Sequence, residues 1–180
     1  PADDAAVQPE GEVSDPQPET ALTALIGGSE TVTEVSTADE LTAAIADSNV
    51  STVRLAGDIS ISRSLTVTRT VTLDLNGHVL KYESANKGSV IVVEGGGQLT
   101  IEDSNTSKPS HKFKPNDDGL WVLDEASGTE TVTGGVITGG TGYPFPLTSG
   151  KVVYYGGGVY IAPGGQLTMT GGNIIGCSAE

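Results

Sequence analysis

The chain has 180 residues and a formal net charge of −14, with 23 acidic and nine basic side chains. This charge argues against nucleic acid or an anionic lipid surface as the partner, because Lys and Arg side chains are what bind phosphate groups. No apolar run approaches the roughly 18 residues that a membrane span requires. The 25 glycines, the abundant Thr and the scarcity of aromatic residues predict many short strands joined by tight corners, and not a helix bundle.

The first part of the chain differs in composition from the rest. Residues 1–34 carry eight acidic side chains, no basic one and four prolines. Low hydrophobicity, charge of one sign and proline together favour a segment that does not fold, because too little apolar surface is available to offset the entropy of ordering. The predicted organisation is therefore an acidic, Pro-rich flexible arm at 1–34 and one folded domain at 35–180.

A short helix is predicted next, at about 37–47. Thr37 and Glu40 have the spacing of a capping box, in which each residue's side chain accepts a hydrogen bond from the other's backbone N–H. Leu41, Ala44 and Ile45 then fall on one helix face. Since so short a helix is marginal alone, we expect it to cover the open first end of the strand structure that follows.

Residues 52–101 alternate between apolar and polar positions, as strands with one buried face do. Two stretches then recur. IVVEGGGQLTI at 91–101 has a near copy, VYIAPGGQLTM, at 159–169, and TVTGGVITG at 131–139 matches TMTGGNIIG at 168–176. Repeated strand-turn-strand units predict a solenoid.

The pair Asn76-Gly77 has two interpretations. It is the strongest short-range signal for a β-hairpin, which would place His78 on the buried face and Val79 outside. In a solenoid corner, Asn76 or Gly77 takes the left-handed conformation and Val79 turns inward. The apolar pattern favours the corner.

Two segments resemble a known superfamily. VRLAGDISISRSLTVTRTVTLDLNGHVLKY, preceded by ELTAAIA, resembles the first turns of right-handed parallel β-helix proteins of the pectate-lyase-like superfamily. GGGVYIAPGGQLTMTGGNIIG resembles the Gly-rich rungs of cell-surface proteins from Gram-positive bacteria. The resemblance implies an all-β fold, a right-handed parallel β-helix with a short N-terminal capping helix and two inserted loops, and a secreted or cell-surface location. It leaves the function open, because lyases, hydrolases, adhesins and stalks share this architecture.

The spacing of the repeats indicates where the insertions lie. A rung of about 22 residues leaves about nine extra residues between Ile101 and Val132, and about 15 between Val132 and Met169. These excesses fit two non-repetitive stretches, 104–119 and 141–157, which we expect to project as loops. Binding residues in solenoids concentrate in such insertions.

The insertions hold most of the aromatic residues, since seven of the eight lie between Phe113 and Tyr160. Exposed rings on rigid loops stack on sugar faces or anchor a protein interface. The alternative is that the rings pack over the bases of the loops. The predicted ligand contacts are Phe113, Tyr143, Phe145, Tyr154 and Tyr155, with Lys112 and Lys114 steering the ligand.

No catalytic residue, metal or cofactor is predicted. Asp117 and Asp118 resemble the adjacent aspartates of polygalacturonase-type hydrolases, but the Gly-His-Gly and Arg-Ile-Lys motifs of those enzymes are absent. His78 and His111 lack the spacing of metal ligands. A calcium ion held by 103–105 or 116–118 stays an alternative.

The functional hypothesis is a non-catalytic, adhesin-like surface or secreted module that binds a host or environmental glycan or glycoprotein through its aromatic loops. The alternatives are a polysaccharide lyase or glycoside hydrolase of the β-helix type, and a structural stalk. The last repeat carries no cap, so either further rungs of the same full-length protein follow or another copy docks on the open edge. We expect the further rungs as partners.

Overall fold

The helix predicted at the start of the folded part is present as α1 (Ala38–Ala46). The computed structural model describes residues 31–179. In it, Thr37 Oγ1 accepts from the Glu40 N–H at 3.2 Å, and a Glu40 carboxylate oxygen accepts from the Thr37 N–H at 3.1 Å. Leu41, Ala44 and Ile45 are buried. The capping box and the apolar face are confirmed.

The strand β1 (Val32–Val35) begins inside the segment that the sequence assigned to the arm. It pairs with β2 (Thr52–Leu55), from Val32 opposite Thr52 to Val35 opposite Leu55. Folded structure therefore starts before residue 35, because β2 offers an edge to which residues 32–35 can bond. The rest of the predicted arm, residues 1–30, lies outside the described residues.

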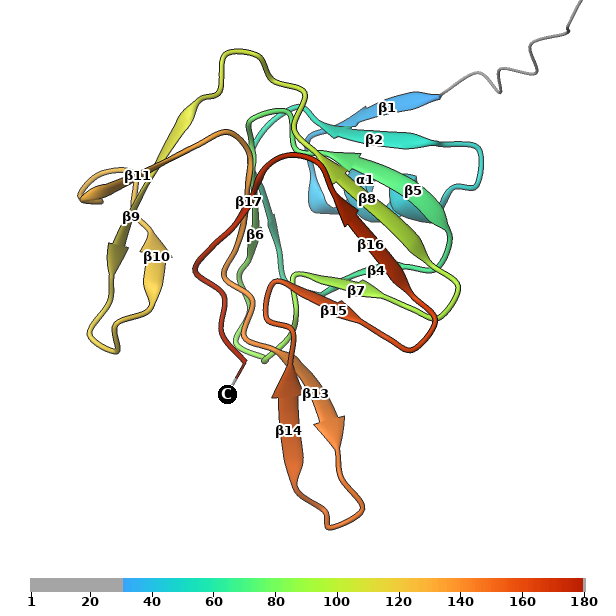
Figure 1. Ribbon diagram of the computed structural model, residues 1–180. Helices are drawn as coiled ribbons and strands as arrows, with labels where there is room; N and C mark the ends of the chain where they lie inside the picture. Colours follow the sequence, from blue (N-terminus) through green and yellow to red (C-terminus); the bar gives the residue numbers. More distant parts are fainter. Residues whose placement is uncertain (1–30, 180) are drawn as a thin grey trace, which may run out of the picture.

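Most strands belong to three sheets in which every pair of neighbours is parallel (Figure 1). The chain visits sheet A, then B, then C, and repeats this order. Sheet A consists, in the order of its strands, of β1, β2, β5 (Thr70–Asp74), β8 (Gln98–Glu102) and β16 (Gln166–Met169). Sheet B consists of β17 (Asn173–Ile174), β12 (Val136–Thr138), β6 (Val79–Tyr82) and β3 (Ile59–Ile61). Sheet C consists of β15 (Val159–Ile161), β7 (Ile91–Val93) and β4 (Leu65–Val67).

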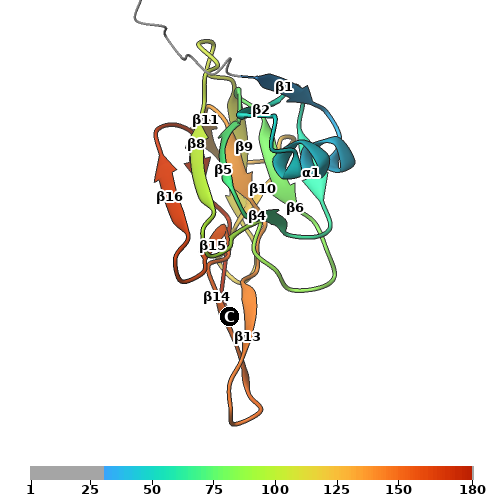
Figure 2. The same ribbon diagram turned by 90° about the vertical axis from the view of Figure 1, so that its right-hand side faces the viewer.

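Two antiparallel units interrupt this order. The projecting sheet, β10 (Trp121–Leu123), β9 (Ser110–Pro115) and β11 (Glu130–Thr133), is inserted between β8 and β12. The hairpin, β13 (Tyr143–Pro146) and β14 (Val152–Tyr155), is inserted between β12 and β15. Figure 1 shows both units leaving the parallel sheets, and the hairpin lies at the bottom of Figures 1 and 2. The all-β prediction with one short helix is confirmed, and the sheets are mixed.

Both insertions were predicted as loops, and both are paired strands. The first also continues well past Gly119, to Thr133. The cause is long-range pairing: β9 bonds to β10 on one side and to β11 on the other, so the backbone of the whole segment finds partners. Periodicity within one segment does not reveal such pairing.

The sequence repeat corresponds to neighbouring strands. Gln98, Leu99 and Thr100 in β8 lie directly opposite the three identical residues that begin at Gln166 in β16. In the shorter repeat, Val136 lies opposite Asn173 as the match predicts. The first residues of that match, 131–133, were predicted as part of a rung, which is wrong because β11 pairs antiparallel with β9.

The corner interpretation of Asn76-Gly77 is confirmed. The strands on its two sides, β5 and β6, belong to sheets A and B, so no hairpin forms there. Asn76 (φ 47°) and Gly77 (φ 80°) both take the left-handed conformation. The predicted inward turn of Val79 is wrong: Val79 is buried on the outer face of sheet B, in a cluster with Phe113 and Val136, and Leu80 is the residue that enters the core.

The core lies between the three parallel sheets, where inward side chains of successive strands stack in register. Leu73, for example, is fully buried with Val53 opposite it on one side and Ile101 on the other. On the last strands the corresponding side chains are uncovered: Ile161, Met169 and Ile174 are 43%, 40% and 39% exposed. The partnership with further rungs stays a prediction.

Shortening one member of this stack has a predictable cost. We expect Leu73→Ala to lower the free energy of unfolding by about 2–5 kcal/mol, since it removes buried methyl groups and leaves a cavity. Thr70→Ala, on the exposed side of the same strand, is the matched control and should change it by less than about 0.5 kcal/mol. Urea unfolding followed by circular dichroism measures both, and equal losses would contradict the assigned core.

Candidate functional site

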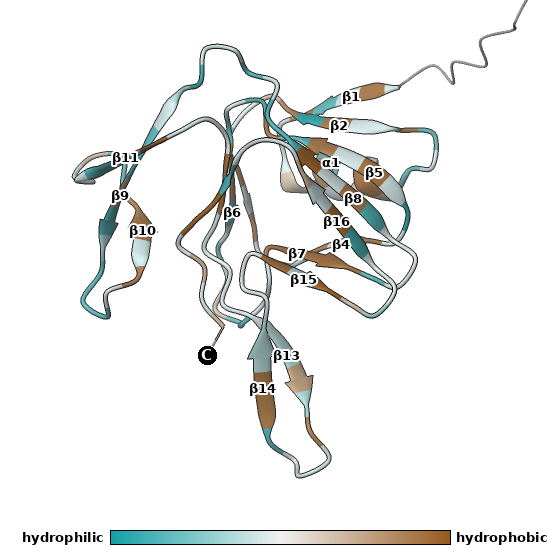
Figure 3. Ribbon diagram, in the orientation of Figure 1, coloured by the Kyte–Doolittle hydropathy of each residue, from teal (hydrophilic) through white to brown (hydrophobic). Residues whose placement is uncertain are grey.

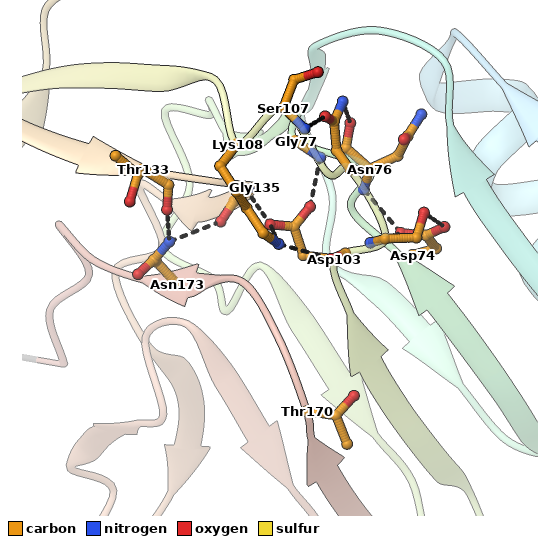
Figure 4. Close-up of polar contacts among 12 residues, drawn as sticks. Asp74, Asn76, Gly77, Asp103, Ser107, Lys108, Thr133, Gly135, Thr170 and Asn173 are labelled. Atoms are coloured by element: carbon orange, nitrogen blue, oxygen red, sulfur yellow. Dashed lines mark hydrogen bonds and ion pairs between the residues drawn. The ribbon is translucent and has the colours of Figure 1, made fainter.

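A buried carboxylate holds the corner from which the projecting sheet leaves. Asp103 accepts hydrogen bonds from the Gly77 N–H at 2.6 Å, the Gly135 N–H at 3.0 Å and Lys108 Nζ at 2.9 Å (Figure 4). Its side chain is 1% exposed. Gly77 and Gly135 precede strands of sheet B, so this one carboxylate ties the first residue after β8 to two strands of the next sheet.

A second carboxylate, Asp74, supports the same corner from the end of β5, the strand that pairs with β8. It is fully buried and accepts from Arg54 Nε at 2.8 Å, Ser104 Oγ at 2.6 Å and the Asn76 N–H at 2.9 Å. Burial opposes ionisation of Asp74 and Asp103, but these hydrogen bonds outweigh it and lower the pKa of both groups. Both carboxylates are therefore ionised and engaged in structural contacts.

The inner face of β9 packs onto the parallel sheets. His111 is 7% exposed, with Nε2 2.8 Å from the Gly77 carbonyl oxygen and Nδ1 2.9 Å from a Glu125 carboxylate oxygen. Phe113 is fully buried and clusters with Val79 and Val136. The prediction that Phe113 contacts a ligand is therefore corrected: its ring belongs to the core, because β9 folds back over sheet B.

Lys112 and Lys114 alternate with these buried residues and lie on the opposite face of β9. Lys114 Nζ bonds to Ser127 Oγ at 2.8 Å and pairs with the carboxylate of Asp124. The hydrogen bond from Lys114 and those from Ser127 lower the pKa of Asp124. Lys112 is exposed. The projecting sheet thus presents one lysine that is paired with a carboxylate and one that is exposed.

One face of the hairpin carries exposed rings in fixed contact. Tyr143 lies opposite Tyr155 and Phe145 opposite Val153, which puts these four side chains on the same face. Phe145 meets Tyr155 edge to face, with ring centroids 6.1 Å apart. At the base, Tyr143 stacks on Tyr160 of β15 at 4.5 Å. Phe145 and Tyr155 are 43% and 48% exposed.

The other face of the hairpin is different. Tyr154 lies there, opposite Pro144, and Lys87 Nζ stands 4.5 Å from the centre of its ring. Val152 is exposed on the same face. The predicted contact residues did not include Val152, Leu147 and Tyr160. The alternation of apolar residues on both sides of the Thr-Ser-Gly-Lys turn could have revealed the first two.

The predicted contact residues do not form one surface. Phe113 is in the core, and Lys112 and Lys114 lie on the projecting sheet. Tyr143, Phe145 and Tyr155 share one hairpin face and Tyr154 lies on the other. Figure 1 shows the hairpin and the projecting sheet as separate units. The most exposed rings of the insertions are Phe145 and Tyr155 on one hairpin face, and Trp121 is the exposed ring of the projecting sheet.

The comparison with protein families agrees with this architecture. A family model described as "Putative pectate lyase-like adhesive domain" matches residues 32–128, more than half of the chain. The chain belongs to this family. No curated protein and no solved structure matches the chain. The predicted relation to the pectate-lyase-like superfamily is confirmed, and the likeness to surface proteins of Gram-positive bacteria stays a prediction.

The hairpin of this adhesive-domain protein lies beyond the matched range and in an almost uncharged part of the chain. Residues 131–179 contain no acidic residue, and Lys151 is their one charged side chain. The cores of protein interfaces are likewise poor in charge and rich in aromatic residues. Composition therefore separates residues 131–179, which include the hairpin, from the acidic part of the chain before them.

Two further observations concern other kinds of site. Within residues 31–179, no three or more His, Cys, Asp and Glu side chains are grouped as metal ligands would be. The same residues include no helix of the length and hydrophobicity that a membrane crossing needs.

The corner carboxylate predicts an acid dependence of stability. We expect Asp103→Asn to lower the free energy of unfolding at pH 7 by at least about 2 kcal/mol, because a buried charged acceptor is lost. Since the pKa of Asp103 is lowered in the folded state, its contribution is present above the ordinary carboxyl range and is lost as pH falls through the lowered value. Urea unfolding at pH 7 and about pH 2 should show the gap between the two proteins shrink. A gap of equal size at both pH values would contradict this role.

Proposed function

We propose that this member of the adhesive-domain family is a non-catalytic surface or secreted module that binds a host or environmental glycan or glycoprotein through its hairpin. The observation that carries the proposal is the exposed pair Phe145–Tyr155 on one hairpin face. The family's description as adhesive supports the general function. The ligand class rests on the chemistry of the exposed rings.

The geometry suits stacking on a sugar. Aromatic rings present large apolar faces, and their two side-chain torsions leave little entropy to lose on binding. The edge-to-face contact holds Phe145 and Tyr155, and the stack with Tyr160 holds Tyr143. The three rings are thus oriented before a ligand arrives.

The support for the hairpin is part of the same proposal. Sheets A, B and C are the walls of a right-handed parallel β-helix, and α1 covers its first end. The repeated order of visits and the parallel register between neighbours support this view. A stack of this kind holds insertions at its corners rigidly, because each coil is fixed by its neighbours.

Two observations favour binding over catalysis. The buried carboxylates Asp74 and Asp103 are engaged in structural hydrogen bonds. A groove of about 720 Å³ between α1 and residues 61–64 has one lining carboxylate, Asp39, whereas glycoside hydrolysis uses two across a cleft. A second groove of about 340 Å³ between α1 and β1 is lined by Glu34, Glu40 and Asp47, but Glu40 and Asp47 accept backbone hydrogen bonds at the two ends of the helix.

A glycan and glycoprotein array tests the proposal. We expect a specific hit whose affinity falls about tenfold or more in the double variant Phe145→Ala/Tyr155→Ala, because removing anchor rings costs more than 1 kcal/mol. Tyr154→Ala, on the opposite face, is the matched control and should bind as the parent does. Equal loss in both variants would place the contact elsewhere.

The alternative functions predict other results. Release of unsaturated or shortened products from polygalacturonate, with or without calcium, would make the protein a lyase or hydrolase. A protein that neither binds on the array nor turns over polymer would be a stalk.

A further inference from the structure

The two edges of the hairpin differ in their backbone groups. The Leu147 N–H donates to the Lys151 carbonyl at 2.7 Å. Hydrogen-bonded pairs alternate along an antiparallel ribbon, so the next two are Phe145 with Val153 and Tyr143 with Tyr155. The backbone groups of the residues between them point away from the partner strand.

On β13 the residues between are Pro144 and Pro146, and on β14 they are Val152 and Tyr154. Proline has no N–H, so the outer edge of β13 cannot accept another strand. The outer edge of β14 keeps both N–H groups and both carbonyls. Among the described strands, β14 pairs with β13 alone. The hairpin therefore has one closed edge and one open edge.

The open edge is built to be a strand. Val152, Val153, Tyr154 and Tyr155 are β-branched or aromatic, the types that strands favour. In Figure 3 the part of β14 nearest the turn is coloured as hydrophobic. A two-stranded ribbon is marginal in water, whereas a sheet of more strands is stable, so adding strands at this edge stabilises the hairpin.

The distribution of charge restricts where two copies of the chain can touch. Two copies of a chain with net charge −14 repel each other over most of their surfaces. The hairpin projects from the body in Figures 1 and 2, and residues 131–179 contain no acidic side chain. Two hairpins can therefore meet without bringing acidic side chains of residues 131–179 against each other.

We propose that β14 of one molecule pairs antiparallel with β14 of a second copy about a two-fold axis at Val153. This register places Val152 opposite Tyr154 of the second copy, and by symmetry Tyr154 opposite Val152, so both outward residues exchange hydrogen bonds. Lys151 falls opposite Tyr155 of the second copy, where the ammonium can meet the ring face. The contact is self-complementary, as a two-fold interface requires.

The pairing gives a four-stranded sheet that joins the aromatic faces of the two hairpins. Val153 and its symmetry mate lie directly opposite, so the faces that carry Phe145 and Tyr155 are on the same side of the joined sheet. Two weak ligand contacts then act together, which raises avidity. The contact uses the same hairpin as the proposed function, chiefly through backbone edge groups. Of the two exposed rings it involves only Tyr155, which Lys151 of the second copy can meet.

Sedimentation of the intact protein over a concentration series up to the millimolar range tests the pairing. We expect the average mass to rise from 18.3 kDa toward twice that value. Val152→Pro removes one outward donor, spares the bonds to β13 and should stay monomeric. Val152→Thr keeps the donor and is the matched control, which should associate as the parent does.

Amide hydrogen exchange gives a second readout that does not depend on a variant. In the parent, the amides of Val152 and Tyr154 should become protected as concentration rises, while those of Val153 and Tyr155, which face β13, are protected throughout. Protection of the latter two in Val152→Pro shows that its hairpin is intact.

A parent protein that stays monomeric throughout, or an intact Val152→Pro variant that still associates, overturns the pairing. Either result leaves ring-dependent glycan binding unaffected, because the array test changes the side chains of Phe145 and Tyr155 and keeps the backbone groups of the edge. If the parent protein associates but binds nothing on the array, the proposed ligand site is wrong and the pairing stands.

Discussion

Register between successive parallel strands is the constraint on which the rest of this structure depends. Leu73 is buried because Val53 and Ile101 lie opposite it in the neighbouring strands, and Leu99 is buried in the same way between Val71 and Leu167. One extra residue within such a strand would turn each following side chain to the other face. Additions to the chain are therefore tolerated only where it passes from one sheet to the next. Both antiparallel units are inserted at such passages, one between sheets A and B and one between B and C.

The two insertions have different roles because their bases differ. The projecting sheet is fixed by the buried carboxylate of Asp103 and by the ring of Phe113, so much of its inner face extends the core. The hairpin has no comparable cover, and its rings hold one another in place while they stay exposed. An adhesive protein needs a rigid support and an uncovered, preformed contact surface. In the proposed function, the parallel sheets are the support and the hairpin is the contact surface.

Local signals in the sequence predicted local structure well. The capping box at Thr37, the strands before residue 102 and the corner at Asn76-Gly77 depend on residues close together in the chain. The burial of Phe113 does not, because it requires β9 to fold back on strands from before and after the insertion. Residues 131–133 were assigned to a rung for the same reason. A sequence match cannot show that the backbone of this segment pairs with β9. The exposed hairpin face was predicted only in part, because pairing across the turn decides which rings share a face.

The central claim is that the hairpin face, and not the projecting sheet, is the adhesive surface. Hydroxyl-radical footprinting of the protein, free and bound to its strongest glycan or glycoprotein hit, measures this directly at the aromatic side chains. Trp121, an exposed ring of the projecting sheet, is the internal reference. Bound ligand should lower the reactivity of Phe145 and Tyr155 and leave that of Trp121 unchanged. Protection of Trp121 with unchanged reactivity in the hairpin would contradict it.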